Sequence, residues 1–131
     1  MDPRDLLLGS FRAALAAADP LQIVPPHLPK PPRGRTLVVG AGKAAAAMAL
    51  AVERHWPRDA ALDGLVITRY GHATRTSRIR VIEAGHPVPD ESGEAAAREI
   101  LAAARALGED DLLLVLVSGG GSSLLALPAE G

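Results

Sequence analysis

The stretch Asp111–Leu125, D-L-L-L-V-L-V-S-G-G-G-S-S-L-L, decides the fold of this chain. Its six consecutive apolar residues, Leu112–Val117, are too few for a typical helix, and they lie between an aspartate and three glycines. An apolar run of this length without alternation is typical of a parallel strand that is buried on both faces. We therefore expect a central strand of a parallel sheet here.

The loop directly after this strand has the composition of an anion-binding loop. Its glycines let the backbone turn sharply and present its N–H groups, and its serines supply hydroxyl donors and a helix N-cap. The alternative is an ordinary glycine-rich turn, because a short motif of this kind is weak by itself. The residues predicted to bind a phosphate or nucleotide here are Ser118, Gly119, Gly120, Gly121, Ser122 and Ser123.

A second glycine loop follows an earlier apolar segment, Thr36–Val39, and leads into a run of strong helix formers. A strand, a glycine turn and a helix form the phosphate-binding βα arrangement, in which the helix N-terminus offers N–H groups and a partial positive charge. Gly40 and Gly42 are the predicted phosphate-binding glycines of this loop. Lys43 comes next, in the first turn of the helix, where a cation opposes the helix dipole unless an anion binds beside it. Lys43 is therefore the predicted catalytic cation.

Two more predicted strands, Leu65–Thr68 and Arg78–Glu83, alternate with Ala-rich helical segments, and a turn is expected at Asp63-Gly64. The alternation predicts an α/β fold with a doubly wound, Rossmann-like parallel sheet, incomplete in this chain, in the order 3-2-1-4. In that order both glycine loops lie at one crevice. His86 follows the third strand at the same edge and is a candidate for substrate binding; the alternative is that it only hydrogen-bonds its own loop.

The first 35 residues carry no evident chemistry. Asp2-Pro3 predicts the start of an amphipathic helix that ends at Asp19-Pro20 and docks on another element. Six prolines between Pro20 and Arg35 predict an extended surface linker.

Composition excludes several classes of function. With 131 residues the chain is about one domain, and its formal net charge of -1 argues against a nucleic-acid partner. It has no cysteine, and its four histidines are scattered, so no structural metal is expected. No segment predicts a secretion signal or a membrane span, so a cytoplasmic location is expected.

Two other enzyme classes are weighed by their motifs. An NAD site requires an acidic residue near the end of the second strand to bind the ribose hydroxyl, but Thr68, Arg69 and Tyr70 occupy these positions. Arg69 could instead meet the 2′-phosphate of NADP, so a reductase remains possible only with NADPH. A serine hydrolase is disfavoured because the serines do not stand in a G-x-S-x-G motif.

Four motifs of the chain resemble the N-terminal domain of the glycerate 2-kinase family, whose second domain is called MOFRL and whose members are often labelled hydroxypyruvate reductases. They are Ala17–Pro20, Val39–Ala44, Glu83–Asp90 and Val117–Leu124. The resemblance implies ATP-dependent phosphorylation of D-glycerate at its 2-hydroxyl, with Mg²⁺, in a cleft between two domains. Metal ligands stay unassigned, because Asp90, Glu91 and Asp111 fit better as helix and turn caps.

The resemblance also concerns the extent of the chain. Family members are much longer, and this sequence ends at Gly131, soon after the Ser-Gly loop. We therefore expect residues 1–131 to be part of the first domain, without MOFRL, and to be inactive alone and marginally stable or self-associating. The alternatives are an NADPH-dependent hydroxypyruvate reductase and a non-catalytic module that binds a nucleotide or sugar phosphate.

Overall fold

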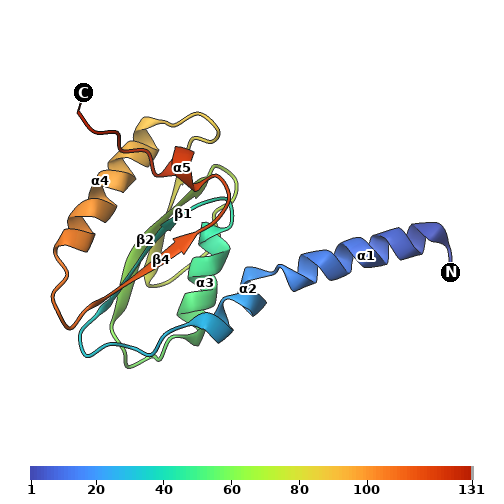
Figure 1. Ribbon diagram of the computed structural model, residues 1–131, viewed down its shortest axis with the longest axis horizontal. Helices are drawn as coiled ribbons and strands as arrows, with labels where there is room; N and C mark the ends of the chain where they lie inside the picture. The colour runs from blue at the N-terminus through green and yellow to red at the C-terminus, as the bar shows by residue number, and fades with distance from the viewer. Residues whose placement is uncertain (131) are drawn as a thin grey trace.

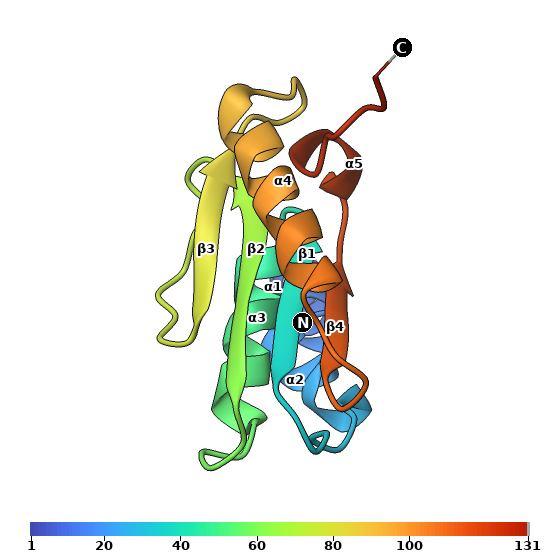
Figure 2. The ribbon, with the colours of Figure 1, turned by 90° about the vertical axis from the view of Figure 1, so that its left-hand side faces the viewer.

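The computed structural model describes residues 1–130, and its centre is a four-stranded parallel sheet. The strands follow the order β3-β2-β1-β4, and each neighbouring pair is parallel (Figure 2). Both the parallel sheet and the predicted order are thereby confirmed. The strands are β1 (Thr36–Ala41), β2 (Leu62–Arg69), β3 (Ile79–Ala84) and β4 (Leu112–Val117).

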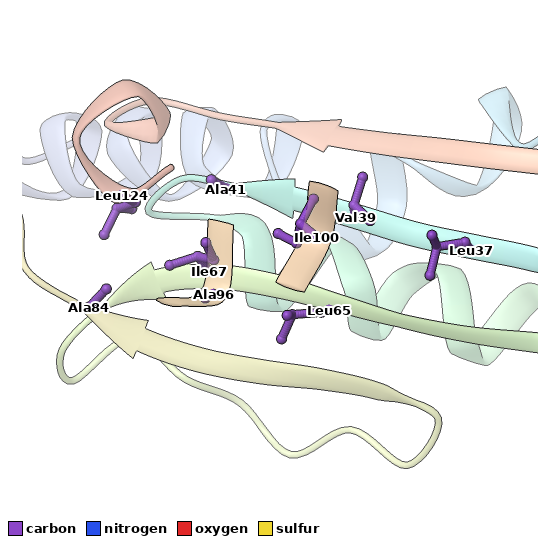
Figure 3. Close-up of a cluster of buried hydrophobic side chains, with 9 residues drawn as sticks. All are labelled: Leu37, Val39, Ala41, Leu65, Ile67, Ala84, Ala96, Ile100 and Leu124. Carbon is purple, nitrogen blue, oxygen red and sulfur yellow. The ribbon is translucent and has the colours of Figure 1, made fainter. Parts of the chain in front are cut away.

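Helices cover both faces of the sheet, which makes the fold doubly wound (Figures 1 and 2). Helix α3 (Ala45–His55) lies on one face, where Ala45, Ala49 and Val52 are fully buried. Small alanine side chains let this helix approach the strands closely. Helix α4 (Glu91–Arg105) covers the other face. Figure 3 shows the buried cluster beneath it, formed by Leu37, Val39, Ala41, Leu65, Ile67, Ala84, Ala96, Ile100 and Leu124.

Strand β4 lies at the edge of the described sheet and pairs only with β1. Leu113, Val115 and Val117 are 41%, 53% and 70% exposed. The prediction of a central strand buried on both faces is therefore wrong for residues 1–130. The cause is the path of α4, which packs over β1, β2 and β3 and leaves the same face of β4 uncovered.

Helix α1 (Pro3–Ala17) forms as predicted, with the Asp2 carboxylate accepting a hydrogen bond from the N–H of Arg4 at 3.0 Å. It projects away from the sheet (Figure 1), and none of its residues is buried. Leu7 is 71% exposed and Phe11 is 61% exposed. The expected docking partner is thus absent from residues 1–130.

The first half of the proline-rich segment is helical, which corrects the expectation of an extended linker there, whereas residues 28–35 lie in no helix or strand. It folds into α2 (Pro20–Ile23) and the 3₁₀ helix η1 (Pro25–His27). Both begin with proline, which the first turn of a helix tolerates because its N–H would lack a partner there. Val24 and Leu28 pack against the buried cluster on the α3 side.

Two smaller observations complete the description. Asp63 and Gly64, expected to form a turn, belong to β2. No helix in the described part of the chain is both long and apolar enough to cross a bilayer.

Candidate functional site

The two glycine loops meet at the carboxyl edge of the sheet, where β1 and β4 end side by side. The N–H of Lys43 donates to the Gly119 carbonyl oxygen at 2.8 Å, and the N–H of Ser118 donates to the Ala41 carbonyl oxygen at 3.1 Å. The N–H of Ala44 donates to the Ser118 hydroxyl at 3.0 Å, across 74 residues of sequence. The loops therefore form one structure at the point where the strand order reverses, where open α/β sheets bind ligands.

The amides before α3 are largely engaged inside the protein. Besides Lys43 and Ala44, the N–H of Gly42 donates to the Ile67 carbonyl oxygen at 3.0 Å and that of Ala45 to the Gly42 carbonyl oxygen at 3.1 Å. In a G-x-G-x-x-A site, such amides hold the pyrophosphate. Here the amides of Lys43 and Ala44, just before α3, pair with the second glycine loop instead.

Gly40 and Gly42 are needed for this close approach of the loops. A Cβ atom on Gly40 would lie 2.0 Å from the Leu116 carbonyl oxygen, and one on Gly42 would lie 2.0 Å from the Ser118 hydroxyl oxygen. Contacts that short do not occur between real atoms. Both glycines therefore let β1 and its loop pack against β4.

The Ser-Gly loop leads into the short helix α5 (Gly121–Leu124) through Gly120, whose φ is 87°. No acceptor among residues 1–130 pairs with the amide N–H groups of Gly119 and Gly120. The Ser123 hydroxyl donates to the Gly120 carbonyl oxygen at 3.1 Å, whereas Ser122 is exposed. The loop thus offers open amides and one open hydroxyl, while the Ser118 hydroxyl faces α3.

Lys43 and His86 approach the loop from different elements. A Cβ atom on Gly119 would lie 3.6 Å from Cε of Lys43, and one on Gly120 would lie 2.6 Å from Nε2 of His86. The exposed Lys43 forms no ion pair within the described chain. An uncompensated ammonium beside open amides makes this edge electropositive and suited to a small anion.

The sequence did not indicate the group that supports the His86 loop. Asp90 caps α4 as predicted, accepting from the N–H of Gly93 at 3.1 Å, but its second oxygen accepts from the Tyr70 hydroxyl at 2.7 Å. The pKa of Asp90 is lowered, first by the N–H of Gly85 and then by the Tyr70 hydroxyl. The same hydrogen bond raises the pKa of Tyr70. Only the position of Tyr70 just after β2 could have hinted at this pair.

The described residues contain no group of three carboxylate or imidazole side chains placed to hold a metal ion. Asp111 accepts hydrogen bonds from the N–H of Gly108 at 2.8 Å and of Arg35 at 2.9 Å, which ties the start of β4 to the start of β1. Asp90 and Asp111 therefore act as caps.

These features define a Rossmann-like α/β protein whose polar loops gather at the carboxyl edge of the sheet. The sequence model of the family described as a domain of unknown function, DUF4147, matches residues 6–131, and the chain belongs to this family.

The relatives carry two kinds of name. A protein of Agrobacterium vitis named "Putative hydroxypyruvate reductase" is 57% identical over 95% of this chain and 28% of its own length. A protein of Pyrococcus horikoshii named "Glycerate 2-kinase" is 37% identical over all of this chain and 32% of its own length. The chain thus spans about a third of the length of these relatives.

Two solved structures share the fold. A protein of Pyrococcus horikoshii superimposes with a TM-score of 0.82 at 37% identity, covering 100% of this chain and 32% of the other. A structure titled as a glycerate kinase of Thermotoga maritima gives 0.77 at 35% identity, covering 91% and 29%. The predicted resemblance to the glycerate 2-kinase family is confirmed.

Proposed function

We propose that this chain is the phosphate-holding part of a glycerate 2-kinase, an enzyme that transfers the γ-phosphoryl group of ATP to the 2-hydroxyl of D-glycerate. The names of two curated relatives support the substrate and the reaction class. The observation that carries the proposal is the placement of Lys43 beside the open amides of Gly119 and Gly120.

Phosphoryl transfer needs little covalent chemistry from the protein. It needs donors that neutralise the charge of the phosphoryl oxygens and hold them in place. In our proposal the ammonium of Lys43 is the electrostatic clamp, and the open amides of Gly119 and Gly120 with the Ser122 hydroxyl bind phosphate oxygens. The proposed phosphate site is supported by the contacts that join the two glycine loops, which involve Gly40, Gly42 and the Ser118 hydroxyl.

His86 is the proposed D-glycerate contact. Its imidazole lies against Gly120, beside the proposed phosphate position, and is partly exposed. An imidazole N–H can donate to the carboxylate or a hydroxyl of a small hydroxy acid. This places the proposed acceptor next to the proposed phosphate site.

The ATP phosphates fit this arrangement, because the Lys43 side chain lies beside the open amides of Gly119 and Gly120. The described residues hold no cluster of three ligating side chains, and we assign none of them to Mg²⁺, which one or two carboxylates together with the ATP phosphates would hold. We propose that segments corresponding to the rest of the longer relatives, including a MOFRL domain, supply the remaining wall of the cleft. Residues 1–131 alone are then expected to lack kinase activity, because the transferring group is neither shielded from water nor aligned.

A reductase is the competing proposal, since one relative carries that name. Its NADPH pyrophosphate would need the amides at the start of α3, and those of Lys43 and Ala44 already pair with Gly119 and Ser118. Arg69, which would contact the 2′-phosphate of NADPH in that proposal, is the last residue of β2 and so stands at the carboxyl end of the strand. A non-catalytic binding module would bind ATP in the full-length protein without turning it over.

The deciding experiment is a coupled assay of the full-length protein with ATP, Mg²⁺ and D-glycerate, run beside NADPH and hydroxypyruvate. Lys43→Ala should lower kcat/KM of the kinase reaction by on the order of 10² or more, the range for losing a preorganised charge contact. Lys30→Ala is the matched control, because Lys30 is the other lysine of the chain and lies in the proline-rich segment. Wild-type kinetics for Lys43→Ala, or activity with NADPH alone, would overturn the proposal.

A further inference from the structure

The loop that carries His86 is closed around a single carboxylate. It runs from Gly85 to Asp90, between β3 and α4. A Cβ atom on Gly85 would lie 2.4 Å from the Val88 carbonyl oxygen and 3.1 Å from Cγ of Asp90, so the loop folds tightly onto the Asp90 side chain. One Asp90 oxygen caps α4 through the N–H of Gly93. The other faces out of the loop and accepts from Tyr70.

Tyr70 reaches this carboxylate from the neighbouring loop, the one that follows β2. Its ring is 55% exposed, and its hydroxyl donates to Oδ2 of Asp90 at 2.7 Å. Next to it, the N–H of Gly71 donates to the Glu83 carboxylate at 2.8 Å. Two hydrogen bonds to side chains thus tie the loop after β2 to the end of β3 and to the loop that follows β3, at the edge where the candidate site lies.

We propose that Tyr70 and Asp90 are positioning residues that hold the His86 imidazole against Gly120, in the orientation that binds the substrate. The inference rests on the proposed function and adds two residues that touch neither phosphate nor substrate. Its basis is a continuous chain of contacts from Tyr70 through Asp90 and the Gly85–Asp90 loop to His86 and the Ser-Gly loop.

The proposal follows from the poor support that His86 has otherwise. The residue lies outside any helix or strand, and the described chain shows no hydrogen bond from its ring. A binding side chain loses effectiveness when it shifts by about 1 Å, so a side chain on a loop needs a second layer of contacts to hold it. The Asp90 carboxylate supplies this support, because it accepts from the Tyr70 hydroxyl of the neighbouring loop and from the N–H of Gly85 next to His86.

A purely structural role for the pair makes a different prediction. The cap of α4 uses Oδ1 of Asp90 and the N–H of Gly93, and this hydrogen bond does not involve Tyr70. Removing only the Tyr70 hydroxyl therefore leaves the cap in place. If the pair served stability alone, that change would lower the melting temperature and leave His86 where it is.

The test is Tyr70→Phe, compared with wild type by NMR and by ligand titration. The nuclear Overhauser contact between the His86 ring and Gly120 should weaken, and the Kd for D-glycerate should rise about tenfold, with Tm within about 2 °C. Thr76→Ala is the matched control, since its hydroxyl donates to the Ile79 carbonyl oxygen at the opposite end of β3. His86→Gln assigns the ring signals.

Each outcome decides a separate point. An unchanged contact between His86 and Gly120 in Tyr70→Phe overturns the positioning role. A weakened contact with unchanged D-glycerate affinity overturns the link to substrate binding. If wild-type protein binds neither ATP nor D-glycerate, the proposed function fails, while the contact between His86 and Gly120 still decides whether Tyr70 positions the ring.

Discussion

Replacing Gly40 and Gly120 by alanine should separate the glycine that the fold needs from the glycine that the site needs. In Gly40→Ala the new methyl group lies 2.0 Å from the Leu116 carbonyl oxygen, a backbone atom of the paired strand β4. Neither strand can yield without breaking the β1–β4 ladder. We expect a loss of at least about 3 kcal/mol, the upper range for overpacking a rigid core.

In Gly120→Ala the strain is smaller and local. The backbone φ of 87° costs a residue with a side chain about 1–2 kcal/mol. The new methyl group lies 2.6 Å from Nε2 of His86, which is the end of a side chain that can rotate away. The fold should survive, whereas the displaced imidazole and the crowded amides should weaken ligand binding by at least tenfold.

The assay is urea unfolding followed by circular dichroism, together with calorimetric titration of ATP and D-glycerate. With a slope of about 1–3 kcal/mol per M urea, Gly40→Ala should lower the midpoint by about 1–3 M. Gly120→Ala, at about 1–2 kcal/mol, should lower the midpoint by about one to two thirds as much, and it should lose affinity. Equal destabilisation by both substitutions, or wild-type affinity in Gly120→Ala, would refute the assignment of Gly40 to the fold and of Gly120 to the site.

Two further predictions concern the start of β4 and helix α1. The pKa of Asp111 is lowered, first by the N–H of Gly108 and then by the N–H of Arg35. The ionised Asp111 therefore stabilises the folded state fully above the unfolded pKa of about 3.9, and this stabilisation is lost as the pH falls through the lower folded pKa. The urea midpoints of wild type and Asp111→Ala should therefore differ at pH 7, and the difference should shrink as the pH falls below about 3.9; a constant gap would contradict this. The second prediction is that exposed apolar residues of α1 drive self-association, so Phe11→Glu should shift sedimentation velocity toward monomer while Ala13→Glu, on the opposite face, should not; equal behaviour would exclude α1 as the contact.

Much of the architecture is determined by local sequence. Short apolar runs between turn residues, such as Leu112–Val117, predict strands, and their alternation with Ala-rich helices predicts a right-handed parallel sheet. The cap at Asp90 and the end of α3 before Pro57 are also local, since each depends on a side chain or ring within a few residues of the helix end.

The roles inside the site depend on contacts between distant segments, and sequence patterns do not contain them. Ser118 and Ser122 stand in one motif, yet the Ser118 hydroxyl accepts from the N–H of Ala44, 74 residues away, while Ser122 is exposed. Gly40 and Gly42 fit a phosphate-binding pattern, but their missing side chains make room for β4 and its loop. The exposure of β4 likewise depends on where α4 crosses the sheet. Local chemistry thus determined which elements form and in what order, whereas only tertiary packing decided which hydroxyls and amides remain open to a ligand.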